Sequence, residues 1–315
     1  MYKTFYHLQK NPFEITPDPA FLFPTLRHNE ALATLYYGVT AHRGFVVLTG
    51  EVGTGKTLLL RSLLGLLQRG DTAFAMVFNP TLSPLEFLRY VVGDFGLATV
   101  GKAKDELLHA LNVFLLQRHQ QGRTTLLVMD EAHQLSPEVL EEIRLLTNLE
   151  TSQQKLLQIV LAGQPELDQK LDTHELRQLK QRIALRCHLD YLNANETGDY
   201  IRRRLTIAGA ESGKKIFDEE AVTVVYRYSK GVPRLINTIC ENSLLAGYAK
   251  QQETVTEEIV ESVARDLRLV PTVTEDKGNG QARIVSVGMD DENLLRAVKL
   301  LLEKRGQADP KGRLQ

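Results

Sequence analysis

Residues 50–57 read Gly-Glu-Val-Gly-Thr-Gly-Lys-Thr, the glycine-rich pattern of a loop that binds phosphate groups. Glycines let the backbone turn with its N–H groups pointing inward, where they attract anions. The lysine and the hydroxyl that end the pattern suit the β- and γ-phosphates and a Mg²⁺ ion, respectively. We therefore expect a nucleotide site in which Lys56 contacts phosphate and Thr57 holds magnesium. The alternative is a tight glycine turn without any ligand.

An acidic pair follows a second apolar run at residues 124–129. Asp130 stands at the carboxyl end of this expected strand, where α/β sheets place their ligands, and is predicted to hold Mg²⁺ through water as a second metal ligand. Glu131 is expected to orient or deprotonate an attacking water. The alternative is the solvated start of a loop. Residues 130–133 spell the Asp-Glu-Ala-His label of some helicases, but no matching helicase motif follows, so we interpret His133 as a loop residue.

The predicted nucleotide-binding residues are Gly50, Glu51, Val52, Gly53, Thr54, Gly55, Lys56, Thr57, Leu58 and Asp130.

Further polar residues fit the same chemistry. Gln164 follows another apolar run and is expected to position the attacking water, with a strand-end cap as the alternative. One of Arg177, Arg182 and Arg186 is expected to act on the nucleotide of a neighbouring subunit, with Arg182 as our first choice and Arg177 as the second; a basic helix face with surface ion pairs is the alternative. Arg234 falls in the first turn of an expected helix, where the helix dipole opposes a cation, which indicates an anionic partner such as a γ-phosphate.

The elements that would position these residues alternate between apolar strands and amphipathic helices. Strands are expected at 45–50, 73–78, 124–130, 155–163 and 183–189. Helices are expected at 29–42, 55–69, 84–96, 103–121 and 136–149. This order predicts an α/β fold, in which helices cover both faces of a parallel sheet.

Four helices without strands follow, at 194–209, 218–229, 233–250 and 256–268. We therefore divide the chain into a docked N-terminal segment that is rich in proline and aromatic residues and expected to be extended rather than helical, an α/β core, a helical lid, a linker, and an amphipathic helix with a tail. Their ranges are 1–30, 31–190, 191–270, 271–289 and 290–315. The apolar stripe of the last helix would dock on a partner or fold back on its own core.

The composition narrows the class of protein. The 315 residues carry 38 basic and 39 acidic side chains, a net charge of −1 that offers no bulk argument for binding nucleic acid or an acidic membrane. The two cysteines form no CxxC pattern, so neither a disulfide framework nor a zinc site is expected. Residues 1–19 lack the apolar core of a signal peptide, and no apolar run is long enough for a transmembrane segment. We expect a cytoplasmic protein, either free or held at the inner membrane through a partner.

Taken together, these motifs resemble those of AAA+ ATPases, and most of all the general secretion pathway A-type ATPases and their exosortase-associated relatives. The likeness rests on "GEVGTGKT", "LLVMDEAHQLSPEVLEEIRLLTNLE", "IVLAGQPEL", "LKQRIALRCHL" and "GVPRLIN", and covers residues 1–268. It implies a five-stranded P-loop sheet, a helical lid and a homo-oligomer that holds ATP at its subunit interfaces. It further implies that Gln164 and Arg234 are the first and second sensors, and that the segment near Pro12 and Phe13 packs near the adenine.

The sequence departs from that group in two ways. The first sensor is usually Asn or Thr in the wider superfamily, whereas Gln164 is longer. The secretion-type relatives continue into a membrane span and a cell-wall-binding region that this sequence does not show, so peptidoglycan binding is not carried over.

Three functions are weighed. The first is an enzyme that hydrolyses ATP with Mg²⁺ and uses the motion of lid and subunits to assemble or remodel a secretion or export machine. The second is an ATP-dependent, DNA-associated regulator like the transposition-regulator ATPases, supported by the basic run Arg202–Arg204, which is otherwise a solvated helix face. The third is a nucleotide-gated scaffold without turnover, against which Glu131 argues.

Overall fold

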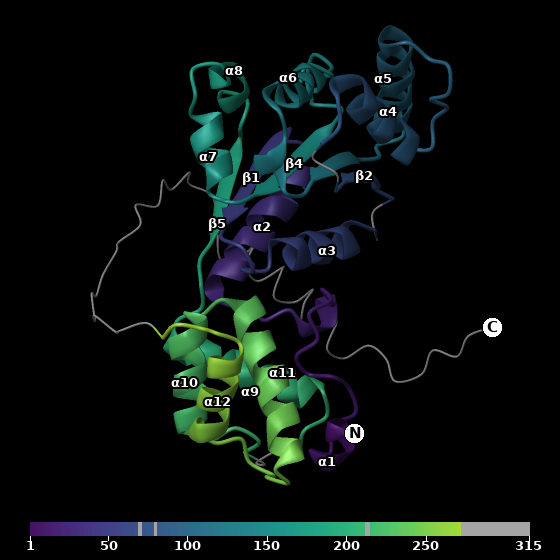
Figure 1. Ribbon diagram of the computed structural model, residues 1–315. Helices are drawn as coiled ribbons and strands as arrows, with labels where there is room; N and C mark the ends of the chain where they lie inside the picture. The colour runs from purple at the N-terminus through teal and green to yellow at the C-terminus, as the bar shows by residue number, and fades with distance from the viewer. Residues whose placement is uncertain (69–70, 79–80, 212–214, 272–315) are drawn as a thin grey trace, which may run out of the picture.

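The computed structural model describes residues 1–68, 71–78, 81–211 and 215–271 (Figure 1). The expected linker beyond residue 271 and the expected helix at 290–315 lie outside the described residues.

A five-stranded parallel sheet forms the centre of the α/β part. Its strands are β1 (Phe45–Gly50), β2 (Ala73–Val77), β3 (Thr125–Met129), β4 (Gln158–Gly163) and β5 (Leu185–Leu189). Their order is β2-β3-β4-β1-β5, and every pairing is parallel. The predicted sheet is therefore confirmed, although β4 begins at Gln158 and β5 at Leu185, both later than expected. Because all strands run the same way, the residues that follow β1, β3 and β4 meet at one edge.

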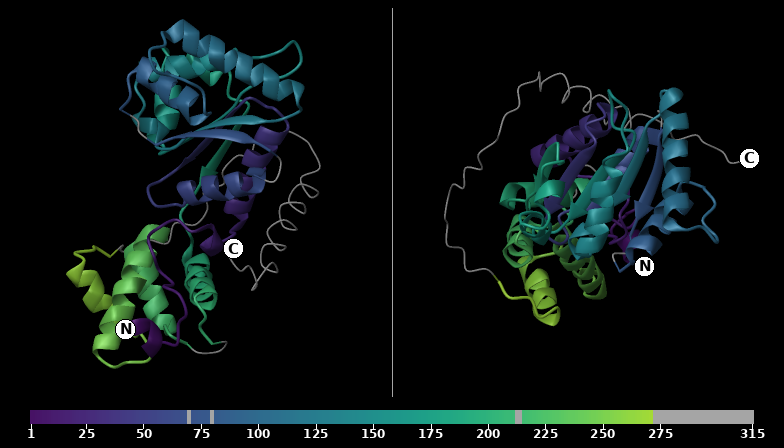
Figure 2. Two further views of the ribbon diagram at one scale, coloured as in Figure 1. Left: turned by 90° about the vertical axis from the view of Figure 1, so that its right-hand side faces the viewer. Right: turned by 90° about the horizontal axis from the view of Figure 1, so that it is seen from above.

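Helices cover both faces of this sheet (Figures 1 and 2), because successive side chains of each strand point to opposite faces. Phe45 and Val47 join one buried cluster, and Val46 and Leu48 join the other. The first face is covered by α4 (Pro84–Asp94), α5 (Lys104–Gln120), α6 (Pro137–Leu146), α7 (Glu166–Leu171) and α8 (Arg177–Lys180). The second is covered by α2 (Leu26–Thr40) and α3 (Lys56–Leu67).

A separate group of helices follows β5: α9 (Ala194–Ile207), α10 (Glu219–Ser229), α11 (Pro233–Ala249) and α12 (Glu257–Asp266). All four were predicted, with ends within a few residues. The starts of two of them are set by side chains that accept backbone N–H bonds, Asn193 at α9 and Asp218 at α10. The short helices α7 and α8 were not predicted, since six and four residues are too few for a helical period to show.

The N-terminal segment packs against this helical region, beside α11 in Figure 1. Tyr2, Tyr6, Leu8 and Phe13 belong to the same buried cluster as the helices α9 to α12. The expectation of a docked segment without helix needs correction, because Tyr2–Phe5 form the short helix α1 and Pro19–Phe21 a 3₁₀ turn, η1. The helix α2 also begins earlier than expected, at Leu26, where the Thr25 side chain accepts the His28 N–H.

The connection between the sheet and the helical region relies on Gly231. Its φ is +75°, and a Cβ atom there would lie 1.8 Å from the carbonyl oxygen of Leu192, the residue whose N–H donates to the Gly231 carbonyl. Any other residue at position 231 therefore overlaps backbone that has little room to shift.

We predict that Gly231→Ala lowers the free energy of unfolding by more than about 3 kcal/mol, because a buried overlap adds to the strain of a positive φ. Gly101→Ala is the matched control, since Gly101 also has a positive φ, +73°, but nothing within 4 Å of its would-be Cβ. Its cost should be about 1 kcal/mol. Urea titrations of both variants measure the difference, and equal losses would contradict the steric role of Gly231.

Candidate nucleotide site

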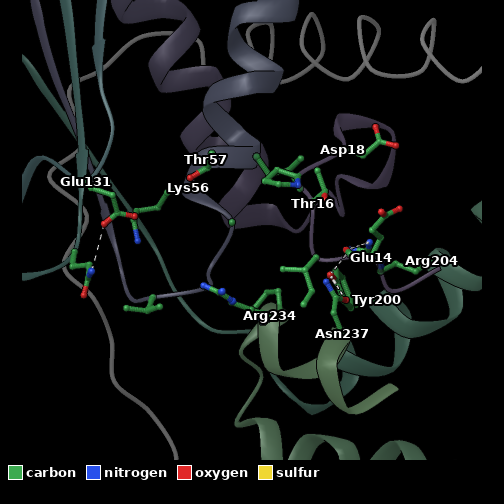
Figure 3. Close-up of a pocket in the computed structure, with 18 residues that line it drawn as sticks. Glu14, Thr16, Asp18, Lys56, Thr57, Glu131, Tyr200, Arg204, Arg234 and Asn237 are labelled. Atoms are coloured by element: carbon green, nitrogen blue, oxygen red, sulfur yellow. Dashed lines mark hydrogen bonds between the residues drawn. The ribbon is translucent and has the colours of Figure 1, made fainter. Parts of the chain in front are cut away.

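A cavity of about 350 Å³ lies at the edge of the sheet where the strands end. It is bounded by the glycine-rich loop, the N-terminal segment, the loops after β3 and β4, and the first turn of α11 (Figure 3). Figure 3 shows Lys56, Thr57 and Glu131 toward one end, Tyr200 and Arg204 toward the other, and Arg234 between them. The volume is in the range of small-molecule and cofactor sites.

The glycine-rich loop connects β1 to α3, as the sequence predicted. Gly53 and Gly55 have φ values of +80° and +102°, which other residues rarely adopt. A Cβ atom on Gly53 would also lie 2.9 Å from side-chain atoms of Val232 and Arg234. Gly53 is thus needed twice: for the turn, and for the close approach of α11.

Lys56 is buried, and its ammonium donates to the carbonyl oxygens of Gly50 at 2.7 Å and Glu51 at 2.9 Å. Burial lowers the pKa of Lys56, while the nearby carboxylates of Glu131 and Asp130 act in the opposite direction. The cation therefore lies inside the loop, where an incoming phosphate would compete with two carbonyl oxygens for it.

Thr57 and Asp130 come together although 73 residues separate them. The Thr57 hydroxyl donates to Asp130 Oδ2 at 2.7 Å, and the other carboxylate oxygen accepts the Glu131 N–H at 2.9 Å. Glu131 has a φ of +53°, a strained value of the kind that collects at functional sites. A hydroxyl and a carboxylate side by side are ligands that suit Mg²⁺, which takes oxygen ligands and completes its shell with water and substrate phosphates.

Gln164 lies opposite Glu131 across the ends of β3 and β4. Its amide nitrogen is 3.5 Å from Glu131 Oε2 and 2.9 Å from His133 Nε2. His133, interpreted from the sequence as a loop residue, lies in the short turn after β3, but its side chain is only 12% exposed and contacts two candidate site residues.

The far end of the cavity is lined by residues 14–18, which directly follow the predicted Pro12 and Phe13. Phe13 is itself buried, edge-on to Phe217 in the helical region. The residues that line the cavity thus lie a few positions after the predicted Pro12 and Phe13, because Phe13 anchors the segment in the helical region.

Arg204 holds this segment in place. Its guanidinium donates to the carbonyl oxygens of Pro12 and Glu14 and to the Tyr200 hydroxyl, and lies 4.6 Å from the centre of the Phe21 ring. Tyr200 in turn donates to Asn237 of α11.

Arg204 is 5% exposed, so its expected availability for DNA phosphates is wrong; Arg202 is exposed but pairs with Asp199.

His28 of α2 contacts the glycine-rich loop and was not predicted from the sequence. Its Nε2 lies 3.1 Å from the Thr54 carbonyl oxygen, and its Nδ1 lies 2.7 Å from the Thr25 hydroxyl. Since a carbonyl only accepts, Nε2 carries the proton and Nδ1 accepts from Thr25. A single histidine well upstream of the loop gives no sequence signal; only the fold shows the contact.

Arg234 and Arg182, which are predicted to act on the nucleotide in different ways, occupy different places. Arg234 is exposed at the second position of α11 and lines the cavity. Arg182 lies outside the lining, in a small hollow with Arg43 and Lys155 near the amino end of β1, where the Ala184 N–H donates to the Phe45 carbonyl. Arg182 is therefore at the edge of the sheet opposite the cavity and does not reach the nucleotide site of its own chain.

Comparison with known proteins supports the same fold. A family profile described as "AAA domain" matches residues 39–171, which include the glycine-rich loop and the strands β1 to β4. Residues 39–171 form an AAA domain. This domain implies nucleotide binding.

One curated relative of this chain, general secretion pathway protein A of Aeromonas hydrophila, is 45% identical over 251 residues. The match covers 79% of this chain but 45% of the relative, so the chain spans less than half of that protein. The predicted resemblance to the A-type group is confirmed.

Solved structures agree on the AAA+ fold. The Aeropyrum pernix ORC2 protein superposes with a TM-score of 0.63 at 16% identity, covering 82% of this chain and 72% of that one. Cdc6p of Pyrobaculum aerophilum gives a TM-score of 0.59 at 18% identity, covering 78% and 70%. At such identities the likeness shows the fold alone. Within the described residues, no helix is long and apolar enough to cross a membrane.

Burial lowers the pKa of His28 from its usual 6.5, so the unfolded chain takes up this proton at a higher pH than the folded chain. The free energy of unfolding should therefore fall as the pH drops below about 6.5, by up to about 1.4 kcal/mol per pH unit from His28. His28→Gln keeps a donor near Thr54 without this titration, so its stability should depend less on pH. His42, whose pKa burial also lowers, supplies a remaining slope. Denaturation between pH 7 and 5 measures both slopes; identical slopes would contradict the buried neutral state of His28.

Proposed function

We propose that this chain hydrolyses ATP with Mg²⁺, and that hydrolysis moves the helical region against the sheet. The observation that carries the proposal is the placement of Thr57, Glu131 and Gln164, which line one cavity at the end of the glycine-rich loop, with Asp130 accepting from the Thr57 hydroxyl. This is the set of groups that phosphoryl transfer to water requires, since catalysis there consists of positioning and charge stabilisation.

In the proposed mechanism, the N–H groups of the loop and Lys56 hold the phosphates once Lys56 releases the Gly50 and Glu51 carbonyls. Thr57 and Asp130 would hold Mg²⁺, which neutralises phosphate charge when bound. Glu131 accepts the proton of the attacking water, and the Gln164 amide orients that water or the γ-phosphate. Arg234 reaches the phosphates from α11 as the second sensor.

Arg182 lies at the edge of the sheet opposite the cavity, a position that suits action on the site of a neighbouring subunit. An arginine near the amino end of β5 cannot serve its own cavity but is free to serve that of an adjacent subunit. We therefore propose a homo-oligomer in which Arg182 completes the neighbouring site, with Arg177, exposed on α8, as the second choice.

For the biological role, we propose assembly or remodelling of a secretion or export machine. The 45% identity to general secretion pathway protein A supports it. The DNA-regulator alternative is weaker than the sequence suggested, because Arg204 of its basic run is buried.

We predict that Glu131→Gln lowers the turnover of ATP by about 10²- to 10⁴-fold, because an amide cannot accept the proton of the water. The affinity for a non-hydrolysable ATP analogue should stay within about twofold, because the phosphate-binding groups remain. Steady-state phosphate release and calorimetric titration measure the two quantities. Turnover at the wild-type rate would refute the assignment of Glu131 as the base.

A mixing experiment tests the trans arginine. Glu131→Gln and Arg182→Ala should each be nearly inactive alone, since one lacks the base and the other cannot complete its neighbour's site. Mixed, they should regain part of the wild-type turnover, because a site with Glu131 intact then receives Arg182 from the other variant. Arg186→Ala, which removes an exposed arginine paired with Asp168, is the matched control and should remain active alone. An Arg182→Ala variant with wild-type turnover would exclude Arg182 and turn attention to Arg177.

A further inference from the structure

His133 occupies the space between the two groups that we assign to the attacking water. Its Nε2 is 2.9 Å from the side-chain nitrogen of Gln164, and its Nδ1 is 3.6 Å from Glu131 Oε2. A side-chain amide nitrogen can only donate, so His133 Nε2 accepts and the ring proton lies on Nδ1, toward Glu131. The Gln164 backbone N–H lies 3.4 Å from Nδ1 and would require the opposite tautomer; the shorter contact decides.

The backbone that carries this ring is held from two other elements. His133 is in the 3₁₀ turn η3 (Ala132–Gln134), whose carbonyl oxygens at His133 and Leu135 accept from Lys170 Nζ of α7 at 2.6 and 2.8 Å. At the end of β4, a Cβ atom on Gly163 would lie 3.1 Å from the His133 N atom. The absence of a side chain at Gly163 thus lets η3 lie against β4, which brings His133 next to Gln164.

His133 does not line the cavity, whereas Glu131 and Gln164 do. Any effect of the ring on the reaction must therefore pass through these two side chains. Catalytic groups have to be held to within a fraction of an ångström, and a displacement of about 1 Å can cost about 10²-fold in rate. Glu131 and Gln164 come from separate loops, and their direct contact of 3.5 Å is long, whereas the contact between Gln164 and His133 is 2.9 Å.

We propose that His133 is the positioning residue of this site: its Nε2 accepts from the Gln164 amide and orients it, while its ring lies beside the Glu131 carboxylate. The role rests on the proposed function, in which Glu131 activates the water. It assigns a purpose to the histidine of the Asp-Glu-Ala-His run without any nucleic acid or helicase activity.

The test compares His133→Ala, His133→Gln and the control His109→Ala, which removes an exposed histidine on α5. We expect His133→Ala to lower kcat by about 10- to 100-fold, with the affinity for a non-hydrolysable ATP analogue within about twofold of wild type. His133→Gln, whose side-chain oxygen can accept from Gln164, should recover part of kcat. Thermal unfolding of each variant confirms that it is folded.

A double-mutant cycle with Gln164→Ala separates positioning from packing. If His133 acts through Gln164, the kcat of the double variant should lie within about twofold of the kcat of the slower single variant. Multiplied losses in the double variant, wild-type kcat in His133→Ala, or an equal loss of nucleotide affinity would each overturn the role. A wild-type protein without ATP turnover would overturn the proposed function itself, and the role of His133 with it.

Discussion

The close approach of the glycine-rich loop to the first turn of α11 is the contact on which the site depends. Side-chain atoms of Val232 and Arg234 lie 2.9 Å from the position that a Cβ atom of Gly53 would take, so the loop and the helix lie in direct contact. This contact places the only exposed cation of that turn, Arg234, beside the loop that ends in Lys56. A cation at a helix N-terminus is opposed by the helix dipole, and an anion bound between the loop and α11 would relieve that opposition. The nucleotide is thus expected to join the sheet to the helical region.

The N-terminal segment makes a second connection between the same two parts. It starts in the core of the helical region, passes along the cavity at residues 14–18, and then enters α2 beneath the loop, where His28 contacts the Thr54 carbonyl. Arg204 fixes its middle by hydrogen bonds to two of its carbonyls, and Tyr200 passes the contact on to Asn237 of α11. Asn237 is one turn beyond Arg234 on the same helix. Because these contacts form a continuous chain around the cavity, a shift of α11 on nucleotide binding would also displace the N-terminal segment.

Much of this could be predicted from the sequence, because the strongest signals are local. The continuous apolar runs of the strands and the caps at Ser136 and Asn193 define the larger elements, and the glycine-rich loop and the Asp130–Glu131 pair adjoin recognisable strands. The unpredicted parts depend on contacts across long stretches of chain. His28 and Thr54, or His133 and Gln164, meet only because parallel strands bring their ends to one edge. Arg204 is a further example. A run of three arginines predicts a solvated helix face, but the fold turns Arg204 inward to two backbone carbonyls. The roles of the site residues stay predictions until they are tested.

The central claim is that one nucleotide bridges the loop and α11 through Arg234. Titration of a non-hydrolysable ATP analogue and of ADP into the wild type and Arg234→Ala tests it most directly, with Arg202→Ala as a control on an exposed, paired arginine. Loss of a charged hydrogen bond worth about 1.5–3 kcal/mol should weaken binding of the analogue by about 10- to 100-fold. Binding of ADP, which lacks the γ-phosphate, should change by less than about twofold. Unchanged binding of the analogue to Arg234→Ala, or an equal loss for both nucleotides, would contradict the account.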